Sequence, residues 1–237
     1  MKITVGHLFP DMLNLYGDSG NIAVLKHRLQ SRGIETEVTA YGIEDEIDFS
    51  AVDILLIGGG GEREQHLACG RLKQMRDDIV SYAEDGGVIL AVCGGYHILG
   101  KSYDHNGEKA EGIGVLDIIT QNGKERLIGD VVLQSDLVKS TVVGFENHTG
   151  KTSIGNLKPF GRVLYGHGNG DDGTEGVVYR HIIGTNLHGP LLPKNPAVAD
   201  WLIEKAIERR GGELPLAPLN DTAEQEAHNY IVGRFKK

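Results

Sequence analysis

The amino-acid sequence predicts an α/β fold with a flavodoxin-like, mostly parallel sheet, helices on both faces and a strand-rich C-terminal half. In the first hundred residues, short strand-like runs alternate with helical segments, as they do in successive β-α-β units. Two of these runs, 53–57 and 88–92, are almost entirely apolar, which is typical of parallel strands buried on both faces. Beyond residue 112, strand-like runs joined by Gly- and Asn-rich turns dominate.

The first half of the chain alternates regularly between the two kinds of element. Apolar residues at helical spacing predict a helix over 21–32, with Gly33 just after its end. Residues 64–83 are also expected to be helical, with Gly70 as a weak point. The expected strands of this half are 3–9, 35–41, 53–57 and 88–92.

The second half is expected to be built mainly of strands. A helix is predicted over 195–210, with Pro196 near its start and two glycines after its end. A proline-containing connector over 214–220 leads to a last helix over 222–234. The expected strands of this half are 126–134, 141–146, 162–165, 175–179 and 182–187.

Composition indicates an ordinary globular enzyme rather than a nucleic-acid-binding or membrane-spanning protein. The 237 residues carry a net charge of −9, which disfavours nucleic acid as a partner. No apolar stretch reaches the roughly 20 residues needed to span a bilayer, and the amino terminus lacks the apolar region of a signal peptide. The only cysteines, Cys69 and Cys93, are expected to be free thiols in a reducing cytoplasm.

Cys93 is the candidate nucleophile of the chain. It ends the apolar run 88–92 and is followed by two glycines and a segment that can be helical. Such a strand-to-helix turn needs small flanking residues, here Ala91 and Gly95. We expect the helix amino terminus to lower the thiol pKa and favour thiolate, and the Gly94 amide to donate to an oxyanion. The alternative is a buried structural cysteine beside a tight turn.

A second glycine-rich turn follows the strand 53–57. The four glycines at 58–61 allow the backbone to approach a ligand closely with its amides exposed. Neither the Walker A pattern nor the spaced G-x-G-x-x-G pattern is present, which disfavours a phosphate-binding loop. Next to the Cys93 turn, an oxyanion-hole loop in which Gly60 pairs with Gly94 is the preferred interpretation. A plain strand-to-helix turn is the alternative.

His188 is the best candidate for the base that a cysteine nucleophile requires. It ends an apolar strand and precedes Gly-Pro, and His148 is the second candidate because it also ends a strand before a turn. His97 is expected to face away from the site. The ten histidines are scattered and neither H-E-x-x-H nor C-x-x-C occurs, so no metal site is expected.

Four segments together resemble those of class I glutamine amidotransferases of the cobyric-acid-synthase-like branch. They are the stretches 58–61, 91–96, 144–150 and 184–190. The stretches 13–21 and 145–152 give a closer resemblance to the GatD group, the glutaminase subunits of lipid II isoglutaminyl synthases. The resemblance covers nearly the whole chain and implies a single class I glutamine amidotransferase domain over residues 1–237.

The resemblance implies hydrolysis of L-glutamine through a thioester on Cys93, with His188 as base and Gly60 and Gly94 as the oxyanion hole. It also places Arg126 on the α-carboxylate of glutamine, a role that suits a guanidinium; a solvated arginine at a strand end is the alternative. Ammonia would pass to a MurT-like Mur-ligase subunit in a heterodimer, which would use ATP to amidate the D-glutamate of lipid II in peptidoglycan synthesis. No cofactor is expected in this chain, and its location would be cytoplasmic or peripheral to the inner membrane face through the lipid II complex.

One departure from the resembled pattern concerns the third member of the usual triad. The expected glutamate two residues after His188 is replaced by Pro190. Three alternatives are open for the acid: it is dispensable, Glu146 serves, or the partner supplies it. Glu146 and His148 are expected in the pocket. Three other functions remain open: amidation of another acceptor such as a cobyrinic-acid-like one, a stand-alone cysteine hydrolase, and a non-catalytic regulatory subunit.

Overall fold

The computed structural model describes residues 1–170 and 172–235 and contains a six-stranded, mostly parallel sheet. The strand order is β11-β12-β4-β3-β1-β2, and every neighbouring pair except β11–β12 is parallel. These strands are β1 (Lys2–Leu8), β2 (Glu35–Tyr41), β3 (Ile54–Ile57), β4 (Val88–Val92), β11 (Val177–Tyr179) and β12 (Ile182–Thr185). The flavodoxin-like sheet predicted from the sequence is confirmed.

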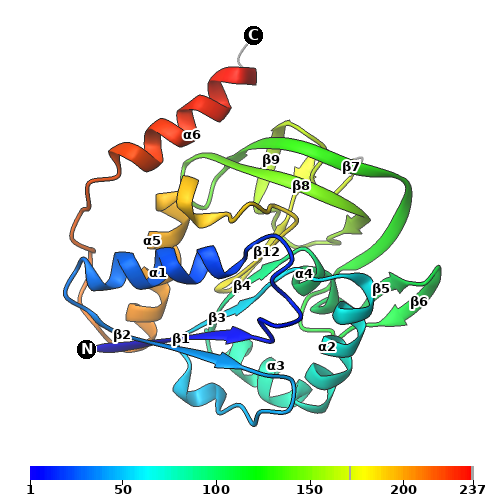
Figure 1. Ribbon diagram of the computed structural model, residues 1–237, viewed down its shortest axis with the longest axis horizontal. Helices are drawn as coiled ribbons and strands as arrows, with labels where there is room; N and C mark the ends of the chain where they lie inside the picture. Colours follow the sequence, from blue (N-terminus) through cyan, green and yellow to red (C-terminus); the bar gives the residue numbers. More distant parts are fainter. Residues whose placement is uncertain (171, 236–237) are drawn as a thin grey trace.

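Helices cover both faces of this sheet, as expected (Figure 1). On β4, Val88, Leu90 and Val92 join one apolar core, while Ile89 and Ala91 join the other. This alternation follows from the two-residue period of a strand. The first core lies beneath α1 (Ser19–Gln30) and α5 (Pro196–Arg209), and the second beneath α2 (Glu62–Gln74), α3 (Arg76–Glu84) and α4 (Gly94–Ile98).

The helix predicted over 64–83 is two helices in the structure. The break lies at Met75, whose φ of −110° and ψ of 21° fall outside the helical region, and not at Gly70. Gly70 sits inside α2, where a Cβ would meet no atom within 4 Å. The glycine is therefore tolerated on an open helix surface, and the prediction of a weak point there was wrong.

The strand-rich half forms a second sheet, with the order β10-β9-β7-β5-β6 and β8 paired with β7. Its strands are β5 (Ser102–His105), β6 (Glu108–Glu111), β7 (Ile119–Ser135), β8 (Ser140–Ser153), β9 (Gly161–Tyr165) and β10 (Thr174–Glu175). The β5–β6 hairpin was not expected. Its turn residues Asn106 and Gly107 both have positive φ, 51° and 78°, which is the Asn-Gly hairpin signal that the sequence carried.

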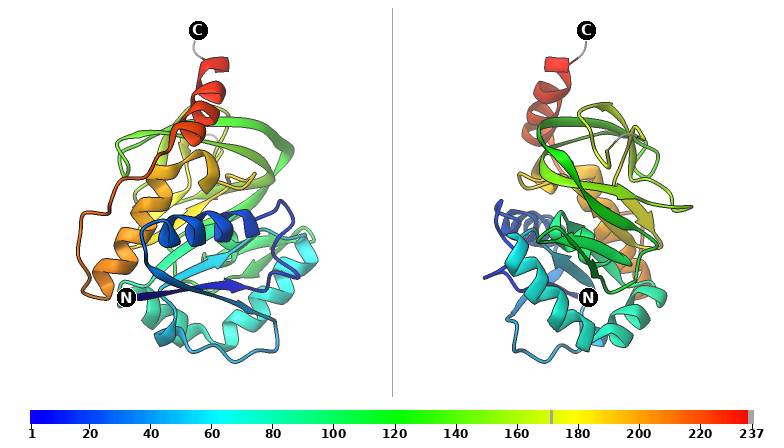
Figure 2. Two further views of the ribbon diagram at one scale, coloured as in Figure 1. Left: turned by 60° about the vertical axis from the view of Figure 1, so that its left-hand side comes forward. Right: turned by 90° about the vertical axis from the view of Figure 1, so that its right-hand side faces the viewer.

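The two sheets share a core. Val131, Leu133 and Val142 of the second sheet, together with Phe160 just before β9, are buried in the same cluster as residues of β4 and α5. Figure 2 shows the second sheet lying beside the first. The last helix, α6 (Thr222–Phe235), contacts β7 and β8 and extends away from the body (Figure 1). Among the described residues, no helix combines the length and apolar character that crossing a membrane requires.

Arg28 ties the C-terminal segments to α1. Its guanidinium donates two hydrogen bonds of 2.7 Å to Asp200 of α5 and bonds of 2.5 and 3.1 Å to Asp221, which precedes α6. The Arg28 side chain is 3% exposed, whereas the two carboxylates are 26% and 30% exposed. Such a bidentate, largely buried cation is worth more than an exposed ion pair.

We predict that Arg28→Ala lowers the free energy of unfolding by roughly 2 to 4 kcal/mol, because Asp221 loses this partner and Asp200 keeps only Arg32. Lys205→Ala is the control, since Lys205 pairs with Glu208 on the helix surface and its loss should cost less than about 1 kcal/mol. Urea denaturation measures both. Equal, small losses in the two variants would contradict the anchoring role of Arg28.

Candidate active site

Three chain segments meet at the carboxyl edge of the parallel sheet. In register, Ile57 of β3 pairs with Ala91 of β4, and Val92 pairs with Thr185 of β12. The glycine loop that follows β3, the turn that follows β4 and the segment that follows β12 therefore start side by side. This edge is where ligands bind in open parallel sheets.

Cys93 occupies a sharp turn between β4 and α4. Its φ of 49° and ψ of −109° are unusual for a residue with a side chain, and its amide donates a 2.7 Å hydrogen bond to the carbonyl of Thr185. Gly95 lies so close to β3 that a Cβ there would overlap the carbonyl oxygen of Ile57. The strand-to-helix turn predicted from the sequence, with Cys93 between strand and helix and a small residue required at position 95, is therefore present.

His188 is brought to the same place from the end of β12. A Cβ built on Gly59 would lie 3.2 Å from Cε1 of His188 and 3.3 Å from Cβ of Cys93. Both side chains thus touch the glycine loop at one residue, and a side chain at position 59 would crowd both. The structure brings together the two residues that the sequence singled out as nucleophile and base.

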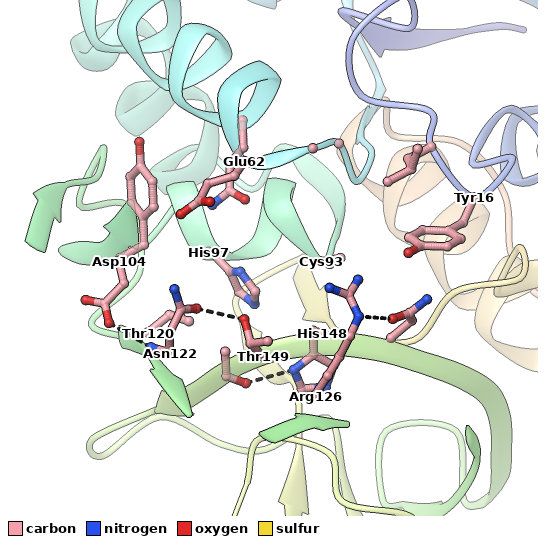
Figure 3. Close-up of a pocket in the computed structure, with 17 residues that line it drawn as sticks. Tyr16, Glu62, Cys93, His97, Asp104, Thr120, Asn122, Arg126, His148 and Thr149 are labelled. Carbon is pink, nitrogen blue, oxygen red and sulfur yellow. Dashed lines mark hydrogen bonds between the residues drawn. The ribbon is translucent and has the colours of Figure 1, made fainter. Parts of the chain in front are cut away.

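Cys93 opens into a cavity of about 230 Å³ (Figure 3). The cavity is bounded by the Tyr16 segment, the glycine loop and start of α2, and strands of the second sheet. Its lining residues are Leu15, Tyr16, Gly60, Gly61, Glu62, Gln65, Cys93, His97, Tyr103, Asp104, Thr120, Asn122, Arg126, Asn147, His148, Thr149 and Gly150. The mix of carboxylates, amides and one arginine suits a small zwitterionic ligand.

Gly60 and Gly94 lie next to each other beside Cys93. A Cβ on Gly94 would be 3.4 Å from the amide nitrogen of Gly60. A Cβ on Gly60 would lie 2.6 Å from the carbonyl oxygen of Met12, so only glycine fits there. The two glycines expected to form the oxyanion hole are therefore neighbours beside the sulfur, on two different loops.

Arg126 lies in β7 and reaches into the cavity toward Cys93 (Figure 3). Its Nε donates a 2.6 Å hydrogen bond to the side-chain oxygen of Asn147 on the neighbouring strand β8. Arg126 is exposed and lies inside β7 rather than at a strand end, so its role in binding glutamine stays a prediction. The guanidinium contributes positive charge to the cavity, which helps to lower the pKa of Cys93.

The expectation that the Cys93 thiol has a lowered pKa was wrong. Burial raises the pKa of this thiol to about 12; the hydrogen bond from Gly94 and the charge of Arg126 lower it, while Asp18 and Glu175 raise it further. Helix α4 has five residues, too few for a strong dipole. Cys93 is consequently a thiol in the free protein.

His188 is also neutral at ordinary pH. Burial lowers the pKa of His188 to about 3, with further lowering from His148, His97 and Arg126. Its side chain is 1% exposed, and neither ring nitrogen has a hydrogen-bond partner among the described residues. A neutral imidazole next to a neutral thiol can accept the proton when the sulfur attacks.

Glu146 does not act on His188 in this structure. Its carboxylate accepts hydrogen bonds of 2.8 Å from the His167 ring and 2.9 Å from the Gly168 amide, and lies 3.6 Å from Nε2 of His148. Burial would raise the pKa of Glu146, but these partners outweigh it and hold the pKa below its usual value. Glu146 is therefore eliminated as the direct orienting acid, which leaves the partner or no acid.

His148 lines the cavity as expected but does not end a strand. It sits within β8, which continues to Ser153, and its Nδ1 is 2.8 Å from the carbonyl oxygen of Gly150. His97 was expected to face away; instead it lines the cavity, with Nε2 2.8 Å from Asn186 Oδ1. The short helix α4 turns His97 back toward the second sheet.

Two buried carboxylates near the site were missed. Asp18 is 0% exposed and accepts a 2.9 Å hydrogen bond from the Gly59 amide; burial raises its pKa to about 6, against this bond. Glu175 accepts from Thr185 and the Asn186 amide, and burial raises its pKa to about 7. Neither residue belongs to a sequence motif typical of catalysis, although Asp18 lies within residues 13–21, which carry part of the resemblance noted above.

Comparisons with known proteins agree with this geometry. The lipid II isoglutaminyl synthase subunit GatD of Staphylococcus aureus (strain N315) is 42% identical, over 100% of this chain and 97% of its own. The GatD subunit of Streptococcus pneumoniae (strain ATCC BAA-255 / R6) is 35% identical, over 95% of this chain and 88% of its own. A crystal structure of a glutamine amidotransferase superposes with a TM-score of 0.58 at 18% identity, covering 85% of this chain and 98% of that one.

A family model gives the same assignment. Residues 4–196 match the CobB/CobQ-like glutamine amidotransferase domain, which spans both sheets and includes the Cys93 turn, the glycine loop and His188. The resemblance stated from the sequence motifs is thereby confirmed. The chain belongs to the CobB/CobQ-like glutamine amidotransferase family.

Proposed function

We propose that the chain is the glutamine-hydrolysing subunit of a lipid II isoglutaminyl synthase. One observation carries the proposal: Cys93, which occupies an unusual backbone turn and lines a polar cavity, and His188 both lie within about 3.3 Å of the position that a Cβ on Gly59 would take. Similarity along almost the whole length of two GatD subunits supports the choice of complex.

L-Glutamine would occupy the cavity with its side-chain amide at Cys93. The Arg126 guanidinium would bind its α-carboxylate, since a planar fork of donors matches a carboxylate. Glu62 and Asp104, which also line the cavity, offer negative charge for the α-ammonium group. The cavity of about 230 Å³ suits an amino acid better than a larger substrate.

The chemistry would proceed through a thioester. As Sγ of Cys93 bonds to the amide carbon, His188 takes the thiol proton, and the Gly60 and Gly94 amides stabilise the oxyanion. His188 then gives that proton to the amide nitrogen, the C–N bond breaks and ammonia leaves. Water attacks the thioester with His188 as base, which releases glutamate and restores the thiol.

The ammonia would be consumed by a second subunit. We propose a MurT-like, ATP-dependent ligase as the partner, which would amidate the α-carboxylate of D-glutamate in lipid II. This chain carries no Walker A or G-x-G-x-x-G pattern, so ATP would bind to the partner. The heterodimer would work in the cytoplasm, at the membrane face where lipid II resides.

A reconstitution tests the proposal. The chain and a MurT-like ligase are mixed with glutamine, ATP and lipid II, and glutamate and amidated lipid II are measured. Formation of both, each dependent on both subunits, is the expected result. Glutamate release without amidated lipid II, but with amidation of a cobyrinic-acid-like acceptor, would overturn the choice of acceptor. Absence of glutamate release in every mixture would overturn the glutaminase itself.

We predict that Cys93→Ala abolishes glutamate release without altering the fold, because the thioester can no longer form. Cys69→Ala is the matched control, since Cys69 is buried in α2 away from the cavity. Steady-state assays and thermal unfolding measure both properties. Residual wild-type turnover in the Cys93 variant would show that another group attacks the amide.

We predict that His188→Ala loses at least about 100-fold in rate, as expected for a positioned acid–base group. His148→Ala should lose less, because its ring shapes the cavity together with Glu146. Single-turnover kinetics compare the two variants. A larger loss in the His148 variant would mean that the two histidines have the opposite roles.

We predict weak glutaminase activity for the isolated chain, with kcat raised by the ligase subunit more than KM is lowered. Within the part of the chain that the structure describes, no acid is hydrogen-bonded to His188, and completion of catalytic geometry appears in kcat rather than in binding. Steady-state glutamate release is measured with the chain alone and in the complex. An identical kcat in both states would exclude completion of the site by an acid of the partner.

A further inference from the structure

The direction of the His188 ring is fixed by packing rather than by hydrogen bonds. Neither ring nitrogen has a partner among the described residues, yet the side chain is only 1% exposed. Position 190, two residues on, holds a proline instead of a carboxylate. A base used in proton transfer must nevertheless be held toward the sulfur, because small misplacements reduce the rate strongly.

The aromatic ring of Tyr16 packs on this imidazole. The centroids of the Tyr16 and His188 rings are 4.4 Å apart, with their planes inclined at 53°. A tilted aromatic pair at this separation is attractive beyond its buried area. The second contact is with Gly59, which lies against Cε1 of His188. These two residues restrict the rotation that an imidazole without hydrogen bonds would otherwise have.

Residues before and after Tyr16 in the sequence are hydrogen-bonded to the glycine loop. The Leu15 amide donates a 2.9 Å hydrogen bond to the Gly59 carbonyl, and Asp18 accepts a 2.9 Å hydrogen bond from the Gly59 amide. Gly17, between them, has a φ of 76°, which allows the tight turn. Both polar groups of the Gly59 backbone are therefore bound to the segment that carries Tyr16.

The same segment also contacts the residue that replaces the acid. A Cβ on Gly20, at the start of α1, would overlap the ring of Pro190. The turn from His188 to Pro190 thus packs against residues 16–20 at two points, Tyr16 on the imidazole and Gly20 on the proline. Position 190, which carries the carboxylate in the usual triad, therefore makes an apolar contact in this chain.

We propose that Tyr16 is a positioning residue that holds the His188 imidazole toward Cys93 by ring packing, in place of an orienting carboxylate within the chain. The inference rests on the proposed function, since it assigns Tyr16 to the same reaction. The aromatic ring carries the effect, and the hydroxyl does not. The contact acts on the base, so its loss falls mainly on the chemical step, although Tyr16 also lines the cavity.

The test is steady-state glutamate release by full-length variants in the complex with the ligase subunit. Tyr16→Ala should lower kcat by roughly 10- to 100-fold through loss of alignment, with KM within about threefold of wild type. Tyr16→Phe should keep nearly wild-type kcat. Tyr230→Ala is the matched control, because Tyr230 is also a tyrosine, is 70% exposed on α6 and is not among the residues that line the cavity, and it should leave kcat unchanged.

Three results would overturn the inference. The first is a wild-type kcat for Tyr16→Ala, and the second is a change in KM alone for that variant. The third is a kcat for Tyr16→Phe that is lowered as much as that of Tyr16→Ala. Thermal unfolding checks that each variant is folded. If Tyr16→Ala does not fold, Tyr16→Leu, which keeps a bulky side chain without an aromatic ring, takes its place. A wild-type complex that releases no glutamate overturns the proposed function as well, whereas an active wild type with an unimpaired Tyr16→Ala overturns this inference alone.

Discussion

The parallel register of β3, β4 and β12 is the constraint on which the site depends. Ile57 pairs with Ala91, and Val92 pairs with Thr185. The three segments that follow these strands therefore leave the sheet at the same level. The amide of Cys93 extends the β4–β12 ladder by one more hydrogen bond, to Thr185. A shift of one residue in either pairing would turn every buried side chain to the other face, and Cys93, His188 and the glycine loop would separate.

Burial determines the resting state of the site. The pKa of Cys93 is raised to about 12 and that of His188 is lowered to about 3, in each case chiefly by burial. The buried carboxylates of Asp18 and Glu175 add to the unfavourable potential at the sulfur. Cys93 and His188 therefore do not form a thiolate–imidazolium pair before the substrate binds. In our account, the proton moves from Cys93 to His188 only when a substrate amide lies between the sulfur and the oxyanion donors.

Much of the architecture could be predicted from local patterns. The alternation of strands and helices gave the parallel sheet, and the apolar run before Cys93 gave the turn, because both signals lie within a few neighbouring residues. The length of β7 and β8 could not be predicted, since their polar outer portions pair in a hairpin that buries little apolar surface. The Asn106–Gly107 hairpin was predictable from its turn signal but was overlooked.

Site residues that belong to a sequence motif could be predicted. Those that reach the site only through tertiary packing could not. Cys93, His188 and the glycine loop carry turn chemistry that can be seen in sequence. The high pKa of Cys93 could not be inferred, because it arises from burial and from Asp18 and Glu175, carboxylates distant in sequence. Tyr16 was likewise not identified, since its contact with His188 joins residues from opposite ends of the chain.

The central claim is that Cys93 attacks the glutamine amide at the cavity beside Gly59. Incubation with a chloroketone analogue of glutamine, followed by peptide mapping, tests it directly, because the analogue binds as glutamine does and alkylates the attacking sulfur. The account predicts stoichiometric labelling of Cys93, loss of glutamate release in parallel with labelling, and protection by L-glutamine. Labelling of Cys69, or labelling of Cys93 that glutamine does not slow, would contradict it.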